Sequence, residues 1–223
     1  MPIDKRAVNA AEALADVSDG ATVFISGFGG AGFPNLLIRA LRDRGPKSLT
    51  LVVNSATHRY SYTYELIEAG LVSKVICTAA RGHSKEPSAF EQLWMDGKIE
   101  LECVPQGTFA ERIRAGGAGI PAFYTPVGFG TELAKGKEVR NFGGRDCVLE
   151  QAIKGDVALV RADTADRYGN LSFRYAQMNF SPVMAAAATL AVAEVRVVLD
   201  EPMPHERVQL PGVFVDRVVT VAA

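Results

Sequence analysis

A glycine-rich loop between an expected strand and an expected helix constrains this chain more than any other segment. Residues 21–25 are strand formers, and glycines follow at positions 27, 29, 30 and 32, within what we call the glycine loop (residues 27–32). Pro34 and the apolar run at 35–41 then predict a helix, because proline loses no hydrogen bond in a first helical turn. A strand that ends in such a loop lets backbone amides approach an anionic or acyl ligand closely.

Short β-branched runs alternate with helical patterns along the rest of the chain. Strands are expected at 21–26, 49–54, 73–78, 99–104, 147–150, 156–161, 191–198 and 213–221, and helices at 4–16, 35–44, 61–69, 88–96 and 182–191. This rhythm predicts an α/β fold with a mostly parallel sheet and helices on both faces. The glycine-dense stretch at 116–130 is typical of loops that wrap a site. No linker or repeat divides the chain, so residues 1–223 are expected to form a single domain.

Composition and charge exclude several classes of protein. The formal net charge of -1 gives no electrostatic reason to expect nucleic acid or an anionic membrane as a partner. No apolar stretch approaches the roughly 20 residues that span a bilayer, and the first residues lack the apolar segment of a signal peptide. Cys77, Cys103 and Cys147 are scattered, which is typical of reduced, structural thiols. We therefore expect a cytoplasmic protein, with Cys77 and Cys103 buried in strands.

The glycine loop matches the dinucleotide-binding pattern in its letters only. Gly27, Gly29 and Gly32 have the G-x-G-x-x-G spacing after an expected strand. A dinucleotide site also needs an acidic residue at the end of the second strand. This chain has Asn54 there, and the first carboxylate after it is Glu65. No lysine follows the glycines, so a nucleoside-triphosphate phosphate loop is excluded as well.

Gln106 places an uncharged amide just after another expected strand, in the sequence 104–108. One interpretation is a turn in which the glutamine faces water. The other is a donor that orients a carbonyl or carboxylate group without adding charge. The residues alone favour the turn and leave both interpretations open.

Basic residues follow several of the expected strands. The segment 166–174 is typical of a turn in which Gly169 or Asn170 takes a positive φ. Within it, Arg167 or Arg174 could face an acidic ligand or a partner chain. The basic loops at 58–59 and 81–85 are either solvated or meet an anionic substrate group.

A complete catalytic set is not evident in this chain. His58, His83 and His205 share no metal-ligand spacing, so no metal site is predicted. The sequence has no G-x-S-x-G nucleophile elbow, and no paired carboxylates stand in a loop of evident function. Chemistry at the glycine loop is therefore expected to need a second polypeptide.

Five ordered segments resemble the A (alpha) subunit of the class I 3-oxoacid CoA-transferases. The family signature has Asp or Asn, then Gly, two residues, an apolar triplet, Gly-Gly-Phe, three residues, Gly, one residue and Pro. Residues 19–34 supply this pattern in register, with one departure: Ser26 stands where the family has the first glycine. The other segments are 105–126, 166–174, 179–185 and 211–219, so the resemblance covers nearly the whole chain.

The resemblance implies a fold like that of ribose-phosphate isomerase and a ping-pong transfer of coenzyme A from an acyl-CoA, such as succinyl-CoA, to a 3-oxo acid. It implies no tightly bound cofactor, since the coenzyme A thioester is the substrate. In the family a glutamate attacks the thioester, and an acyl anhydride leads to a glutamyl-CoA thioester. That glutamate belongs to a Ser-Glu-Asn-Gly motif on the B (beta) subunit, whereas this chain has no such tetrapeptide. A partner B subunit, in an A2B2 heterotetramer, is thus implied.

The resemblance also implies which residues of this chain line the site. The family places Gln106 beside the catalytic glutamate, where a neutral amide is suitable because a cation would hold that glutamate as an inert ion pair. The glycine loop would wall the site and offer backbone donors to developing negative charge. The implied residues of the substrate and coenzyme A site are Gly27, Phe28, Gly29, Gly30, Gly32 and Asn54.

The acceptor acid is implied less narrowly. The segments 27–34 and 97–102 look more like 3-oxoadipate transferases, whereas 107–112 and 116–124 look more like acetoacetate enzymes, and 3-oxoadipate is favoured. A dicarboxylate acceptor would need a second cation, for which Arg59, Arg81 and Lys85 are candidates. A CoA-thioester hydrolase of the same fold and a non-catalytic ligand-binding domain remain alternatives.

Overall fold

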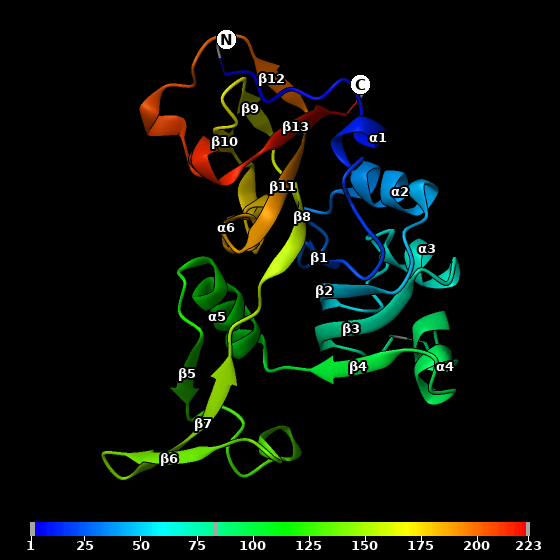
Figure 1. Ribbon diagram of the computed structural model, residues 1–223, viewed down its shortest axis with the longest axis vertical. Coiled ribbons are helices and arrows are strands. Elements are labelled where there is room, and N and C mark those ends of the chain that lie inside the picture. The colour runs from blue at the N-terminus through cyan, green and yellow to red at the C-terminus, as the bar shows by residue number, and fades with distance from the viewer. Residues whose placement is uncertain (1–2, 83, 222–223) are drawn as a thin grey trace.

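A parallel β-sheet occupies the centre of the molecule (Figure 1). The computed structural model describes residues 3–82 and 84–221, so His83 lies outside the described residues. Within them the sheet has seven strands in the order β13-β11-β8-β1-β2-β3-β4, and every neighbouring pair is parallel. The strands are β1 (Thr22–Ile25), β2 (Leu49–Ser55), β3 (Val72–Ala79), β4 (Glu100–Cys103), β8 (Gly155–Arg161), β11 (Ala188–Val195) and β13 (Arg217–Thr220).

Helices cover both faces of this sheet, as Figure 1 shows. One face carries α1 (Ala10–Ala13), α2 (Asn35–Arg44), α3 (Thr63–Glu68) and α4 (Ala89–Met95), and the other carries α5 (Gln106–Gly117) and α6 (Ser181–Ala186). Leu37 and Leu66 are fully buried on the first face, and Phe109 and Met184 on the second. Burial of each such side chain contributes about 1.5–3 kcal/mol. The predicted fold, a single α/β domain with a mostly parallel sheet, is confirmed.

Helix α2 has the bounds that the sequence predicts. Its buried residues Leu37, Ile38 and Leu41 have the spacing of one helical face. Gly45 ends the helix in the left-handed conformation, with φ +76°, and its amide donates to the carbonyl of Leu41 at 3.1 Å. This helix fixes the end of the glycine loop against the first face of the sheet.

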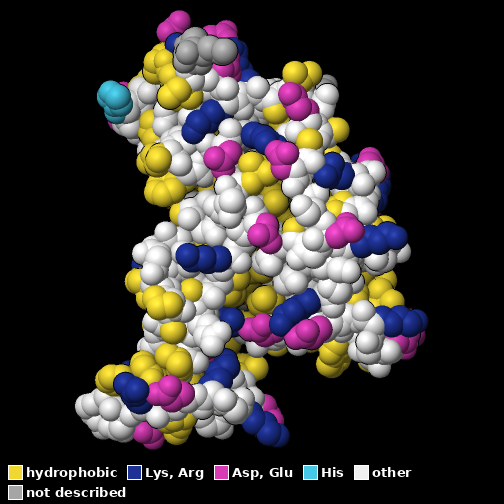
Figure 2. All heavy atoms as spheres, in the orientation of Figure 1, with side chains coloured by type: hydrophobic (Ala, Val, Ile, Leu, Met, Phe, Trp, Pro, Cys, Tyr) yellow, Lys and Arg dark blue, Asp and Glu magenta, His cyan; other side chains and the backbone are white. Residues whose placement is uncertain are grey.

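Two smaller sheets extend the structure. The antiparallel strands β5 (Ala122–Thr125), β7 (Arg145–Gln151) and β6 (Val139–Phe142) form an arm that projects from the lower left in Figure 1. Figure 2 shows hydrophobic and charged side chains mixed over this arm, and Val139 and Phe142 are among its exposed residues. The second small sheet contains β9 (Thr164–Asp166), β10 (Leu171–Ser172) and β12 (Val197–Leu199). The predicted turn lies between β9 and β10, with Gly169 at φ +84°.

Two expected helices are much shorter than the sequence predicts. The helix at 4–16 is confined to Ala10–Ala13, because the preceding residues pair with β13; the amide of Ala7 donates to the carbonyl of Val218 at 2.9 Å. The alanine-rich helix at 182–191 ends at Ala186, since β11 begins at Ala188 and pairs with both β8 and β13. Strand pairing on two sides outweighs the helix preference of alanine.

Other expectations are wrong around the arm. The stretch at 116–130 is not all loop, because α5 extends to Gly117 and β5 follows at Ala122–Thr125. The strand expected at 147–150 is confirmed, since these residues lie within β7, which belongs to the arm. Cys77 is buried as expected, and burial raises the pKa of its thiol to about 12. Cys103 is exposed, because β4 is an edge strand of the main sheet.

Candidate active site

The carboxyl edge of the parallel sheet holds the ends of the strands that carry the predicted site residues. β1 ends in the glycine loop, β2 ends at Asn54 and Ser55, and β4 leads to Gln106 at the start of α5. Ile25 is in register with Val53, so the first two of these ends lie side by side. This edge is where open parallel sheets bind their ligands.

The glycine loop is a tight reversal that depends on its glycines. The amides of Phe28 and Ala31 each donate to the other residue's carbonyl at 3.0 Å. All four glycines of the loop have a positive φ, at +126° for Gly27, +60° for Gly29, +103° for Gly30 and +78° for Gly32. Side chains other than hydrogen are strained in this region, so the sequence predicts the path of this loop well.

Ser26 closes the base of the loop. Its hydroxyl donates to the carbonyl of Gly32 at 2.8 Å and accepts from the amide of Arg161 at 3.3 Å, and the residue is fully buried. The amide of Ser26 also donates to the carbonyl of Leu159 on β8 at 3.0 Å. The residue that departs from the family signature therefore keeps the loop path and adds two hydrogen bonds to it.

Asn179, at the approach to α6, holds the loop from outside. Its Oδ1 accepts from the amide of Gly27 at 3.0 Å, and its Nδ2 donates to the carbonyl of Ala31 at 3.2 Å. A methyl group at Gly32 would lie 2.6 Å from this Nδ2. The side chain thus fills the space that the missing Cβ leaves, and it fixes both limbs of the loop.

Three amides of the loop have no acceptor within the part of the chain that the structure describes: those of Gly29, Gly30 and Gly32. The amides of Ser26, Gly27, Phe28 and Ala31 are all engaged. Phe28 is 42% exposed at the same reversal. The free amides can therefore donate to an oxyanion or a carboxylate without breaking any internal hydrogen bond.

Asn54 is fixed where β2 ends. Its Nδ2 donates to Oγ1 of Thr78 on β3 at 3.0 Å, and that hydroxyl donates to the carbonyl of Asn54 at 2.9 Å. Asn54 is only 8% exposed. The predicted site residue thus lies at the carboxyl edge, with its side chain locked between neighbouring strands.

Gln106 is exposed, as the interpretation of a water-facing glutamine has it, but it begins α5 and does not lie in a turn. The helix is entered through Pro105, whose carbonyl accepts from the amide of Phe109 at 2.8 Å. No hydrogen bond joins Gln106 to the glycine loop among the described residues, and three strand spacings, roughly 14 Å, separate the ends of β1 and β4. The two are linked through aromatic rings: Phe180 lies 6.4 Å from Phe28 and 5.5 Å from Phe109 between ring centroids.

A cavity of about 710 Å³ opens beside the glycine loop. Residues 30–33 form one wall of the cavity. The rest of its lining comes from the start of α2, Tyr60, the ends of β8 and β11, and residues 174–177. Arg161 and Glu194 meet there, with Nη1 and Oε1 2.5 Å apart, and the other oxygen of Glu194 accepts from the amide of Leu37 at 3.0 Å. Burial raises the pKa of Glu194, while the amide of Leu37 and the charge of Arg161 oppose this shift.

Sequence reasoning missed the residues that support the loop from a distance. Arg161 ends β8, Asn179 precedes α6 and Glu194 lies near the end of β11. The local signals were weak: Asn179 begins a family-like segment, Arg161 ends an expected strand, and Glu194 lies within another. Their partners are more than 100 residues away in the chain, so no local pattern reveals them.

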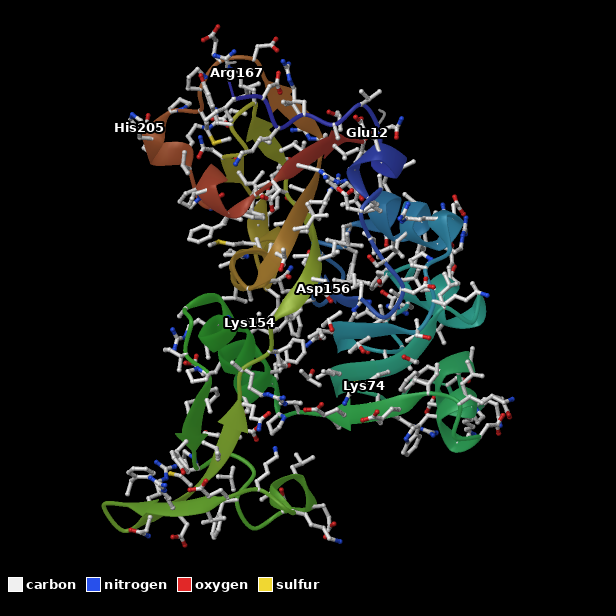
Figure 3. All side chains as sticks on the ribbon, viewed as in Figure 1. Glu12, Lys74, Lys154, Asp156, Arg167 and His205 are labelled. Atoms are coloured by element: carbon white, nitrogen blue, oxygen red, sulfur yellow. The ribbon has the colours of Figure 1, made fainter. Side chains whose placement is uncertain are left out.

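The basic side chains and histidines are dispersed. Arg81 is paired with Glu91 at 3.1 Å, and Arg59 donates to the hydroxyl of Tyr60 at 2.7 Å. Figure 3 shows Arg167 near the top of the molecule and His205 at its outer edge, both away from β1. In the described parts of the chain, no three His, Cys, Asp or Glu side chains form a group able to hold a metal ion.

The fold is shared with solved structures of coenzyme A transferases. An acyl-CoA transferase from Escherichia coli O157:H7 aligns with a TM-score of 0.82 and 23% identity, over 99% of this chain and 48% of that chain. This chain therefore spans about half the length of that enzyme. Glutaconate coenzyme A-transferase from Acidaminococcus fermentans aligns with a TM-score of 0.81 and 20% identity, over 96% of this chain and 74% of that one.

The sequence is also matched over residues 7–220 by the family model of coenzyme A transferase, and the chain belongs to this family. It is 48% identical to the A subunit of the 3-oxoadipate CoA-transferase of Acinetobacter baylyi, over 98% of this chain and 96% of that protein. It is 45% identical to the A subunit of the succinyl-CoA:3-ketoacid coenzyme A transferase of Xanthomonas campestris pv. campestris, over 96% and 88%. The family resemblance that the motifs carry is thereby confirmed.

The described residues contain no helix with both the length and the apolar character that crossing a bilayer requires.

Proposed function

We propose that this chain is the A subunit of a two-subunit CoA-transferase that moves coenzyme A from an acyl-CoA to a 3-oxo acid. The observation that carries the proposal is the glycine loop, with its unused amides at the carboxyl edge of the sheet. Relatives that are 48% and 45% identical bear the names of the A subunits of a 3-oxoadipate CoA-transferase and a succinyl-CoA:3-ketoacid coenzyme A transferase. These names support succinyl-CoA as the donor and 3-oxoadipate or another 3-keto acid, for which acetoacetate is our candidate, as the acceptor.

The partner contributes the nucleophile in this proposal. A B subunit with a Ser-Glu-Asn-Gly motif would present its glutamate to the site, most simply in an A2B2 heterotetramer. The carboxylate adds to the thioester carbonyl and expels the coenzyme A thiolate, which leaves an acyl anhydride. The thiolate then adds to the glutamyl carbonyl of the anhydride, and the acid leaves as a carboxylate. Three unpaired cysteines are consistent with a cytoplasmic location for the pair.

The glycine loop acts as the oxyanion-binding wall. Each addition step creates a tetrahedral oxyanion, and preorganised backbone amides stabilise such a charge without reorganising. The amides of Gly29, Gly30 and Gly32 are the candidates, because those of Gly27, Phe28 and Ala31 already have acceptors. Asn179 keeps the wall rigid, and the hydroxyl of Ser26 adds to its stability.

Gln106 is proposed as the donor that orients the partner's glutamate. It is exposed at the start of α5, near the carboxyl end of β4, where a docked partner can reach it. A neutral amide can hold a carboxylate by hydrogen bonding and still leave it nucleophilic. An arginine or lysine would instead add an ion pair to the hydrogen bond, which stabilises the carboxylate and makes it a weaker nucleophile.

Reconstitution with the B chain tests this function. Gln106→Ala should lose most of the turnover with succinyl-CoA and a 3-oxo acid, while gel filtration shows an intact complex. Gln92→Ala is the matched control, because Gln92 is an exposed glutamine on α4 that binds only Asp96 among the described residues. Unchanged turnover in Gln106→Ala would refute the role of Gln106. Thioester loss that does not depend on the 3-oxo acid would indicate a hydrolase instead of a transferase.

A further inference from the structure

Three arginines but only two carboxylates line the cavity beside the glycine loop. Arg161 is paired with Glu194 at 2.5 Å, and Arg196 binds Asp163 through two contacts of 3.0 and 3.1 Å. Arg174 lines the same cavity. No carboxylate oxygen of the described residues lies within 4.0 Å of its guanidinium. One positive charge in this cavity is therefore left for a ligand.

Arg174 has a defined position relative to the loop. Its backbone amide donates to Oε1 of Gln177 at 2.9 Å, and its guanidinium carbon lies 5.4 Å from the centre of the Tyr175 ring. Asn179 donates to the carbonyl of Gln177 at 3.2 Å and to that of Ala31 at 3.2 Å. A single amide side chain thus ties the arginine-bearing segment to the glycine loop.

Tyr175 has a backbone conformation that a bulky residue seldom adopts. Its φ is +50°, and the residue is 91% exposed at the mouth of the cavity. Residues held in this region are strained, and such strain clusters at ligand sites. Here the conformation presents an aromatic ring to solvent beside the unpaired guanidinium.

We propose that this cavity takes the second carboxylate of a dicarboxylic substrate and that Arg174 binds it. The inference rests on the proposed function, because the reacting carboxyl group must lie at the free amides of the glycine loop. Residues 30–33 form a wall of the cavity as well as part of the loop. A short carbon chain can therefore run from the loop amides past Phe33 and Tyr60 to the arginine.

The other cations considered for this role are less suitable. Arg81 is already paired with Glu91, and Arg59 is bound to the hydroxyl of Tyr60. Neither of them lines the cavity, and nor does Lys85. Arg174 combines access to the cavity with a guanidinium that forms no ion pair among the described residues and a planar fork that suits a carboxylate.

The same subsite serves both halves of a ping-pong reaction. The acyl group of the donor and the acceptor acid occupy one place in turn, since each forms an anhydride with the same glutamate. Arg174 therefore binds the remote carboxylate of any acid or thioester that carries one. Acetoacetate ends in a methyl group and offers this arginine nothing to bind.

Kinetics of the reconstituted A and B pair test the inference. Arg174→Gln should raise KM for 3-oxoadipate by about tenfold or more, the usual effect of losing a charge-assisted hydrogen bond. KM for acetoacetate should stay unchanged. Arg174→Lys keeps the charge and should recover part of the affinity. Arg81→Gln, outside the cavity, is the matched control and should behave as the wild type with both acids.

The phosphates of coenzyme A are another anionic group that Arg174 can bind. Two acyl-CoA substrates distinguish this possibility from binding of a substrate carboxylate. Succinyl-CoA has a remote carboxylate and acetoacetyl-CoA has none, so Arg174→Gln should raise KM for succinyl-CoA only. An equal rise for both donors would assign the cavity to a phosphate and overturn the inference. An equal rise in KM for 3-oxoadipate and acetoacetate in Arg174→Gln would overturn the inference about Arg174 and leave the transferase function intact. A wild-type pair that uses acetoacetate alone would have the same consequence. A wild-type pair that transfers coenzyme A to neither acid would overturn the proposed function itself.

Discussion

The side chain of Asn179 accepts a hydrogen bond from the backbone amide of Gly27 at 3.0 Å, although 152 positions separate the two residues. The Nδ2 of the same Asn179 side chain donates to the carbonyls of Ala31, Ala176 and Gln177. The conformation of the glycine loop is therefore stabilised from the second half of the chain. This contact joins the two segments that form the proposed anion-binding wall.

Asn179→Ala should loosen the glycine loop and lower both stability and activity. The substitution leaves the amide of Gly27 without its acceptor and removes one of the two donors to the carbonyl of Ala31, at an expected cost of about 2 kcal/mol. Thermal unfolding and kcat of the reconstituted pair measure the two effects. Asn179→Asp keeps the acceptor for Gly27 and loses the donor, so it should fall between the wild type and alanine. Equal values for all three would contradict the role of this contact.

Gly32→Ala and Gly29→Ala separate steric crowding from backbone strain. Both glycines have a positive φ, but a Cβ at Gly32 would lie 2.6 Å from the carbonyl oxygen of Gln177, whereas nothing lies within 4 Å of one at Gly29. Gly29→Ala should cost about 1–2 kcal/mol from strain alone. Gly32→Ala should cost more and abolish most turnover, because the loop must move away from Asn179. Denaturant unfolding measures the stability of both variants. A larger loss of stability in Gly29→Ala than in Gly32→Ala would disprove the steric account.

Ser26→Gly restores the family signature and should still reduce stability. The change removes the hydrogen bonds of the hydroxyl to Gly32 and Arg161 from a fully buried site, at about 1–2 kcal/mol. Turnover should stay close to that of the wild type, because the amide of Ser26 keeps its bond to Leu159. Ser26→Ala, which removes only the hydroxyl, is the matched control. A stabilised Ser26→Gly variant would mean that the hydroxyl strains the loop.

Asp166 should make folding stability depend on acidic pH. The carboxylate is fully buried and accepts hydrogen bonds from Tyr168, Asn170 and Met203. Burial raises the pKa of Asp166, but these bonds together outweigh it and the net shift is downward. Because the folded pKa lies below the unfolded one, the stabilisation is complete above about pH 5 and is lost as the pH falls through the folded value.

Asp166→Asn removes this titration along with part of the network. The variant should be less stable by about 2 kcal/mol at neutral pH. Its stability should also change less than that of the wild type between about pH 5 and pH 3. Urea unfolding at a series of pH values measures both quantities. Parallel pH curves for the two proteins would exclude Asp166 as the source of the dependence.

Local sequence patterns account for the elements whose structure depends on near neighbours. The buried face of α2 repeats every three to four residues, and Gly45 supplies its left-handed end, so both bounds follow from the sequence. The glycine loop follows as well, since only glycines adopt its φ values without strain. The parallel sheet follows from the alternation of strands and helices.

Tertiary structure alone decided the features that depend on distant partners. Residues 5–7 and 188–191 favour helices locally, but strand pairing with distant segments supplies more hydrogen bonds and burial. The bonds of Asn179 to Gly27 and of Glu194 to Leu37 join residues more than 150 positions apart. Sequence therefore determined the glycine loop and the family. The folded chain determined which charge beside that loop stays unpaired, because ion pairing depends on distances that only packing sets.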